Sequence, residues 1–338
     1  MMNNTRNDTS NLNHSISMDG SDVTEEVYFI ILIVANVVIA NILSLLGIMG
    51  SILNIIILSH HKMQDTTNVV LLAISVCDLI YSLTQVSLNF SLSSFLINFN
   101  LAQWATVIHA LCIDQINYLA VLTSIHLVTL VSIERMVAVC FPFHVARFLT
   151  ISRVKIIIVS MLCCNILIIS PEFMKAKLFY IEYNNVTLPA LKYQDSFVQN
   201  IYAYIKYYIT INFLVFVCCP FLVISLCTFV TIFHISITSK TKETLSSKEA
   251  IAKRKKEMKS VKIVLIICVL IVFLVLIPFF VQQMLIYIIK IQISQKMSII
   301  AFSIVNILVQ INSSFNFVIY VTGSPKFKKT VVNLFFLK

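Results

Sequence analysis

The sequence predicts an all-α membrane protein, with a bundle of seven transmembrane helices and a short amphipathic eighth helix. Hydrophobic residues make up 59% of the 338 residues and charged residues only 12%, and the mean hydropathy is +0.92. Seven apolar segments are each long enough to cross about 30 Å of hydrocarbon. Basic residues collect in alternate connections between these segments. Such a composition excludes a soluble domain, whose surface needs far more polar side chains.

The spans follow from the apolar segments, and a polar tail and a short final helix flank them. The seven spans are expected near 28–58, 67–97, 106–140, 152–174, 199–233, 260–289 and 297–321. After the domain at 28–321, residues 322–338 place Phe327 and Val331 at helical spacing, with Lys328 and Lys329 on the other side. This pattern predicts an amphipathic helix that lies on the membrane surface.

Residues 1–27 are polar and contain no apolar segment of the kind found in a cleavable signal peptide, so the first span is expected to direct its own insertion. Sequons for N-glycosylation occur in this tail and once more further along the chain. They begin at Asn3, Asn7, Asn13 and Asn185. We therefore expect a glycosylated tail outside the cell.

The charges orient the chain in the plasma membrane. Most of the 25 Lys and Arg residues fall in segments that share one side, and cytoplasmic segments are the ones enriched in Lys and Arg. This predicts an extracellular N-terminus and a cytoplasmic C-terminus. The net charge of +10 is thereby explained by topology and contact with lipid headgroups, and no nucleic-acid partner is expected.

Polar residues inside spans indicate where helices face one another, because a polar group in hydrocarbon needs a partner. Asp78 is the one acid near the middle of a span. An acid surrounded by neutral oxygens can bind a small cation or titrate, and it can equally be a protonated, hydrogen-bonded structural residue. The other such residues include Asn54, Asn117, Ser124, Asn306, Asn312, Ser313 and Asn316.

An acid–base pair, Glu134-Arg135, ends the third span. It is either an ordinary charged helix end or a site of function. Prolines at Pro171, Pro220 and Pro278 interrupt the fourth, fifth and sixth spans. Each removes a backbone donor and bends its helix, which suits a bundle that hinges.

In order and spacing, these residues resemble the rhodopsin-like (class A) G-protein-coupled receptors. The resemblance rests on Asn54 in a Gly-Ser-Ile-Leu-Asn run, Asp78, Ser132-Ile-Glu-Arg-Met136, and the prolines of spans five and six. The run Asn312-Ser-Ser-Phe-Asn-Phe-Val-Ile-Tyr320 is similar to the family's signature in span seven.

The resemblance implies a receptor that binds an extracellular ligand and activates a heterotrimeric G protein. Glu134 would restrain Arg135 until the sixth helix swings outward, and Pro278, Asn316 and Tyr320 would take part in that change. A sodium ion, the one cofactor implied, would be held by Asp78, Ser124, Asn312, Ser313 and Asn316. No other metal site and no enzymatic activity are expected.

Several residues depart from the family pattern. Leu276 and Phe317 replace an expected tryptophan and proline, and Thr228 replaces a tyrosine. Residues 172–200 contain no cysteine, so the family's disulfide to Cys112 cannot form. A second hypothesis is therefore a seven-span protein of this fold with weak or no signalling.

The ligand-facing mouth is expected to be polar. Asn117 stands where aminergic receptors carry an aspartate, and Asp114 lies one helical turn outward on the same face. With Tyr118, Gln282 and Gln283 these residues predict a site for a peptide or a small polar chemical. The style of the motifs is similar to invertebrate peptide and orphan chemosensory receptors. A transporter, the remaining alternative, would show internal repeats and glycine-interrupted half-helices, but the chain has four glycines and no repeat.

Overall fold

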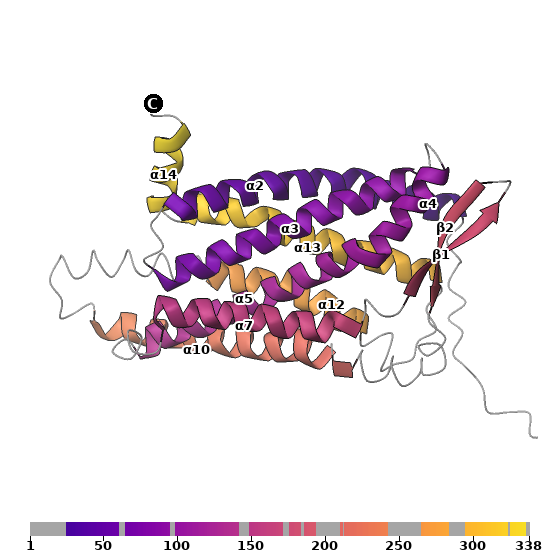
Figure 1. Cartoon of the computed structure of the whole chain (residues 1–338). Coiled ribbons are helices and arrows are strands. Elements are labelled where there is room, and N and C mark those ends of the chain that lie inside the picture. The colour runs from indigo at the N-terminus through magenta and orange to yellow at the C-terminus, as the bar shows by residue number, and fades with distance from the viewer. Residues whose placement is uncertain are drawn as a thin grey trace, which may run out of the picture.

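The computed structural model describes residues 25–60, 65–94, 99–141, 149–171, 176–183, 186–193, 210–211, 213–242, 265–283, 295–323 and 325–335. Its long helices lie side by side in one bundle (Figure 1). A hairpin of β1 (Ala176–Tyr183) and β2 (Val186–Tyr193) lies at one end, and helix α14 (Pro325–Phe335) lies at the other. We refer to these as the hairpin end and the α14 end.

Each predicted span corresponds to a helical run, in which η marks a π-helical segment. The first span comprises α1 (Glu25–Leu32), η1 (Ile33–Ile39) and α2 (Ala40–His60), and the second is α3 (Thr66–Ser94). The third comprises α4 (Phe99–Ile108), η2 (His109–Ile113) and α5 (Asp114–Cys140), and the fourth is α7 (Ile151–Ile169). The fifth comprises η4 (Phe213–Cys218) and α10 (Cys219–Lys242), the sixth includes η5 (Val272–Leu276) and α12 (Ile277–Gln283), and the seventh is α13 (Gln295–Gly323).

Within the described residues, 6 helices are long and apolar enough to cross a membrane, and Leu265–Val281 forms a shorter apolar helix in the sixth span. The predicted bundle is confirmed. The third span begins at Phe99 and the fifth continues to Lys242, beyond the predicted limits at 106 and 233. Hydropathy marks only the part of a helix that crosses hydrocarbon, whereas the backbone hydrogen bonds of a helix continue equally well into water.

Small residues bring α2 close to its neighbours. A Cβ atom added at Gly47 would lie 2.5 Å from the Ser82 Oγ of α3, and one at Gly50 would lie 3.2 Å from the Phe317 Cβ of α13. Helices in a membrane associate through such close packing, because lipid tails are as apolar as the helices themselves. The first, second and seventh spans are thereby held together.

The largest apolar core lies in the half of the bundle toward the α14 end. It includes Ile57, Val70, Leu127, Ile224 and Ile271, from five different spans. Large side chains on the outer surface, by contrast, are exposed along most helices, as expected for side chains that face lipid rather than water.

Helix α14 is amphipathic, as predicted. Phe327 is buried and packs against Tyr320 and Phe317, with ring centroids 5.7 Å and 6.2 Å away. Lys328 and Lys329 are exposed on its other side. The helix therefore docks on the bundle through Phe327, with Val331 packed against the same core.

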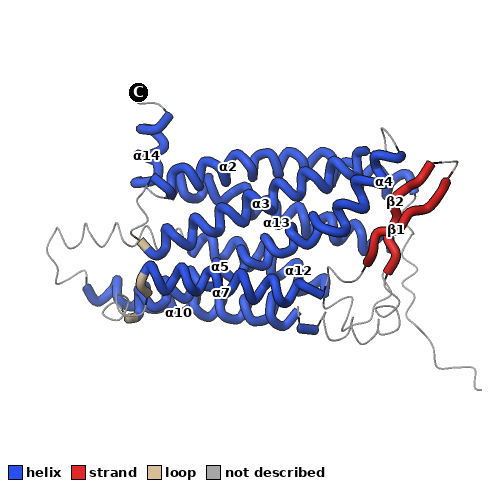
Figure 2. The backbone as a smooth tube through the Cα atoms, viewed as in Figure 1, coloured by secondary structure: helices blue, strands red, loops and turns tan. Residues whose placement is uncertain are grey.

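The hairpin was not anticipated from the sequence. Its strands are antiparallel, with Tyr180 opposite Pro189, and the Tyr180 ring lies 6.2 Å from that of Trp104 in α4. Both strands appear in red beyond the helix ends in Figure 2. The apolar residues of β1 do not alternate with polar ones, and Pro189 within β2 argues against a strand, so the sequence pattern did not indicate this hairpin. The nine cysteines all fall in described residues and are all free thiols there.

Some predictions fall outside the described residues. The glycosylation sites Asn3, Asn7, Asn13 and Asn185 belong to this group. Gln282 and Gln283 are the last two residues of helix α12. The structure does not describe their side chains, so the prediction that they line the mouth also lies outside the described part.

Candidate functional site

Asp78 lies at the meeting point of α3, α5 and α13. Its Oδ2 accepts a hydrogen bond of 2.6 Å from Asn316 Nδ2, and its Oδ1 accepts one of 3.4 Å from Ser124 Oγ. The residue is only 5% exposed. Three helices thus contribute to one buried carboxylate, and a fully buried acid is tolerated only when such donors surround it.

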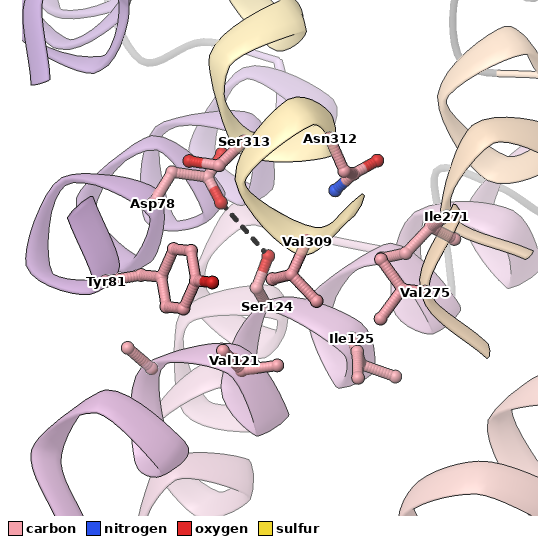
Figure 3. Close-up of a pocket in the computed structure, with 11 residues that line it drawn as sticks. Asp78, Tyr81, Val121, Ser124, Ile125, Ile271, Val275, Val309, Asn312 and Ser313 are labelled. Carbon is pink, nitrogen blue, oxygen red and sulfur yellow. Dashed lines mark hydrogen bonds between the residues drawn. The ribbon is translucent and has the colours of Figure 1, made fainter. Parts of the chain in front are cut away.

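A small cavity of about 20 Å³ borders this carboxylate. Four of the five residues predicted to hold sodium line it: Asp78, Ser124, Asn312 and Ser313. Asn316, the fifth, instead donates to Asp78 directly. Figure 3 shows Ser124 meeting Asp78 across the cavity, with Ile271 and Val275 forming an apolar wall beside Asn312. The volume suits about one water-sized particle.

Glu134 and Arg135, near the α14 end of α5, both reach the first turn of α3. Glu134 Oε1 accepts hydrogen bonds of 2.6 Å from Thr66 Oγ1 and 2.6 Å from Thr67 Oγ1. Arg135 Nη2 donates to the same Thr67 oxygen. The acid and the base are therefore connected through a threonine hydroxyl of the second span.

The sequence reasoning did not identify the two threonines. Hydroxyl residues at the end of a span are common and carry no periodic signal, so only their position next to an acid in the folded bundle reveals a role. Asp65 immediately precedes α3, and its backbone carbonyl accepts a hydrogen bond from the backbone N–H of Val69.

One helical turn before Arg135, a side-chain contact joins the third span to the sixth. Ser132 Oγ lies 2.9 Å from Cys268 Sγ, and Cys268 is 1% exposed. Further along the sixth span, Pro278 is the second residue of α12, which follows the π-helical segment η5. A proline lacks the N–H that would continue the helical ladder, which accounts for irregular helix next to it.

Toward the hairpin end, the predicted mouth residues point to different neighbours. Asp114, the first residue of α5, is exposed, and its Oδ1 lies 2.8 Å from the Nδ1 of buried His109. Asn117 Nδ2 donates to Thr84 Oγ1 at 2.8 Å in α3. Tyr118 packs edge-on against Phe216, with ring centroids 6.4 Å apart. Of these three, Asp114 is the residue that remains exposed.

Asparagine side chains that join spans in this half are not among the predicted site residues. Asn36 Nδ2 donates to Ser303 Oγ at 3.1 Å, joining the first and seventh spans, and Asn89 Nδ2 donates to Asn41 Oδ1 at 3.1 Å, joining the second and first. The signal that pointed to Asp78, a polar residue inside an apolar span, applies equally to them.

This geometry agrees with a comparison to known protein families. The family described as 7 transmembrane receptor (rhodopsin family) matches residues 51–320. The chain belongs to the rhodopsin family of seven-transmembrane receptors. Membership confirms the resemblance drawn from the motifs and establishes the receptor as a multi-pass membrane protein.

One relative gives the comparison more detail. The receptor is 27% identical over 323 residues to the FMRFamide receptor of Drosophila melanogaster, an alignment that covers 88% of this chain and 53% of the relative. The chain thus spans about half the length of the relative that it matches.

Proposed function

We propose that this protein is a peptide receptor of the plasma membrane that activates a heterotrimeric G protein. The observation that carries the proposal is the Glu134-Arg135 pair, held at the end of α5 in a bundle of the rhodopsin family. A relative whose name specifies a peptide, the FMRFamide receptor, supports a peptide rather than a small polar chemical as the ligand.

The hairpin end is proposed to face the outside and the α14 end the cytoplasm. The excess of Lys and Arg in segments on the α14 side supports this orientation. Asp114 then lies at the outer rim, where its exposed carboxylate can pair with a basic group of the peptide. Peptide and G protein would bind opposite ends, and each would favour the same arrangement of the bundle.

Arg135 is the residue proposed to meet the G protein. In the described arrangement its guanidinium donates to α3 rather than to the cytoplasmic surface. A ligand that favours a different packing of the helices would expose this side chain, because a ligand shifts an equilibrium by its difference in affinity for the two states. The arrangement described here is the resting state of this proposal.

Asp78 is proposed to bind a sodium ion in the resting state. The cavity beside it offers the carboxylate together with the hydroxyls of Ser124 and Ser313 and the amide of Asn312. Oxygen donors of this kind are those preferred by small hard cations. The bound ion would supply positive charge to a buried acid and stabilise the helices that contribute these groups.

The experiment that tests the function is a peptide challenge in cells. Cells that express the receptor at the surface are treated with FMRFamide and then with a panel of synthetic neuropeptides, and G-protein dissociation is recorded. The proposal expects at least one peptide to produce a saturable response that Arg135→Ala abolishes at matched surface expression. A receptor that reaches the surface and responds to none of them would favour the alternative, a protein of this fold without signalling, to which the replacements at Leu276 and Phe317 point.

A further inference from the structure

One hydroxyl occupies an unusual position between two charged side chains. Thr67 Oγ1 donates to Glu134 Oε1 at 2.6 Å and accepts from Arg135 Nη2. Thr66 Oγ1 donates to the same Glu134 oxygen at 2.6 Å and has no bond to Arg135. Among the hydrogen bonds of the described residues, Thr67 is therefore the residue that joins both members of the pair.

The chemistry of a hydroxyl explains why a threonine suits this position. A hydroxyl carries one donor and two acceptor lone pairs, so it can serve an acid and a base at once. A carboxylate accepts only and a guanidinium donates only. Hydrogen bonds to charged groups are also the stronger ones, particularly in a buried setting such as that of Glu134, which is 5% exposed.

The same turn of α5 is fastened to a second helix. Ser132 contacts Cys268 of the sixth span at 2.9 Å, while Glu134 and Arg135 contact α3 of the second span. The second and sixth spans are thus joined to adjacent positions of the third. Loss of one attachment changes the position of the helix segment that carries the other.

We propose that Thr67 is a positioning residue that holds Arg135 in the resting state, and that release of this hydroxyl is a step of activation. The inference rests on the proposed function for its consequence, G-protein activation. The structural part does not depend on signalling: without the Thr67 hydroxyl, the α14 end of the bundle opens more often. Cys268, buried in the resting state and bonded to the neighbouring turn, reports that opening.

A matched pair of substitutions tests the role of the hydroxyl. Thr67→Val keeps the shape of the side chain and removes the hydroxyl, whereas Thr67→Ser keeps the hydroxyl and removes a methyl group. Membranes containing the full chain are treated with N-ethylmaleimide, and alkylation of Cys268 is followed by mass spectrometry of its peptide, which distinguishes it from the other cysteines. We expect Thr67→Val to alkylate about tenfold faster than wild type, and Thr67→Ser to stay within about twofold, where tenfold corresponds to about 1.4 kcal/mol.

Two further variants keep the test decisive. Thr66→Val, which removes a bond to Glu134 only, is expected to give a smaller increase than Thr67→Val. Arg135→Ala removes the donor of the bond that Thr67 Oγ1 accepts, so it replaces Thr67→Val if that variant does not reach the membrane folded. Equal rates for Thr67→Val and Thr67→Ser, or for Arg135→Ala and wild type, would overturn the proposal.

Ligand-independent G-protein activation, measured in the same cells, separates this proposal from the proposed function. Faster alkylation in Thr67→Val without any signal from any variant or peptide would contradict the receptor function and support the role of Thr67. A wild type that responds to FMRFamide, with alkylation that does not distinguish valine from serine, would contradict the role of Thr67 alone. Faster alkylation together with raised basal signalling in Thr67→Val supports both.

Discussion

Two buried carboxylates connect α3 and α5 at different heights, and their surroundings differ. Both oxygens of Asp78 accept hydrogen bonds, from Asn316 and Ser124, and a cavity lies beside them. Glu134 receives both of its bonds on Oε1, and its Oε2 has no partner among the described residues.

The difference indicates different roles. A satisfied carboxylate beside a cavity can take up an exchangeable ion without losing its own partners. A carboxylate that shares a hydroxyl with a neighbouring cation is held by few contacts, so it is suited to changing partners. These surroundings support the proposals of ion-dependent stability for Asp78 and of control of the α14 end for Glu134.

The largest effect on stability is expected from Asn316→Leu. This change removes the 2.6 Å donor to Asp78, and a buried acid that loses its principal partner destabilises a protein by about 3 kcal/mol or more. Thermal unfolding of the purified wild type and variant measures this loss of stability. An unchanged melting temperature would show that Asp78 does not depend on that donor, and the comparison of the two carboxylates would lose its basis.

An intermediate effect is expected from sodium itself. Wild type should melt at a higher temperature in NaCl than in N-methylglucamine chloride, with a gain of about 2.7 kcal/mol when sodium is at 100 times its dissociation constant. Asp78→Asn should remove the difference between the two salts, because the neutral amide no longer attracts the cation. Glu134→Gln should retain the difference. Identical melting of wild type in both salts would leave Asp78 with a structural role only.

The smallest effect is expected from Ser124→Ala. The hydrogen bond of Ser124 to Asp78 is long, at 3.4 Å, and bonds of this length contribute little. We expect a loss of less than about 1 kcal/mol in stability together with a weaker response to sodium, measured in the same two salts. A loss as large as that of Asn316→Leu would mean that Ser124 is a principal partner of the acid.

The bundle and the Asp78 cluster follow from the sequence because both depend on medium-range patterns. Apolar segments of sufficient length identify spans, and a polar residue within a span must face other helices. The pattern of polar residues within spans pointed to Asp78, Ser124, Asn312 and Ser313 one by one, the family resemblance grouped them, and the structure shows all four lining one cavity.

Other contacts could not be derived because they depend on rotation and register between helices. Asp114, Asn117 and Tyr118 are close in sequence, yet each faces a different neighbour. Thr67 meets Glu134 across a sequence separation of 67 residues, and nothing in either segment specifies that pairing. The pairing of the hairpin strands and the partners of Asn36 and Asn89 likewise become visible only in the packed structure.

The most direct test of the account is nucleotide exchange on a purified heterotrimeric G protein, with the receptor reconstituted in lipid nanodiscs. Wild type and Arg135→Ala are compared in equal folded amounts, with and without the peptide found active in cells. The account predicts that wild type accelerates exchange, more so with peptide, and that Arg135→Ala does neither while its melting temperature stays close to that of wild type. Exchange that is equally fast with Arg135→Ala, or absent with wild type in the presence of the active peptide, would contradict it.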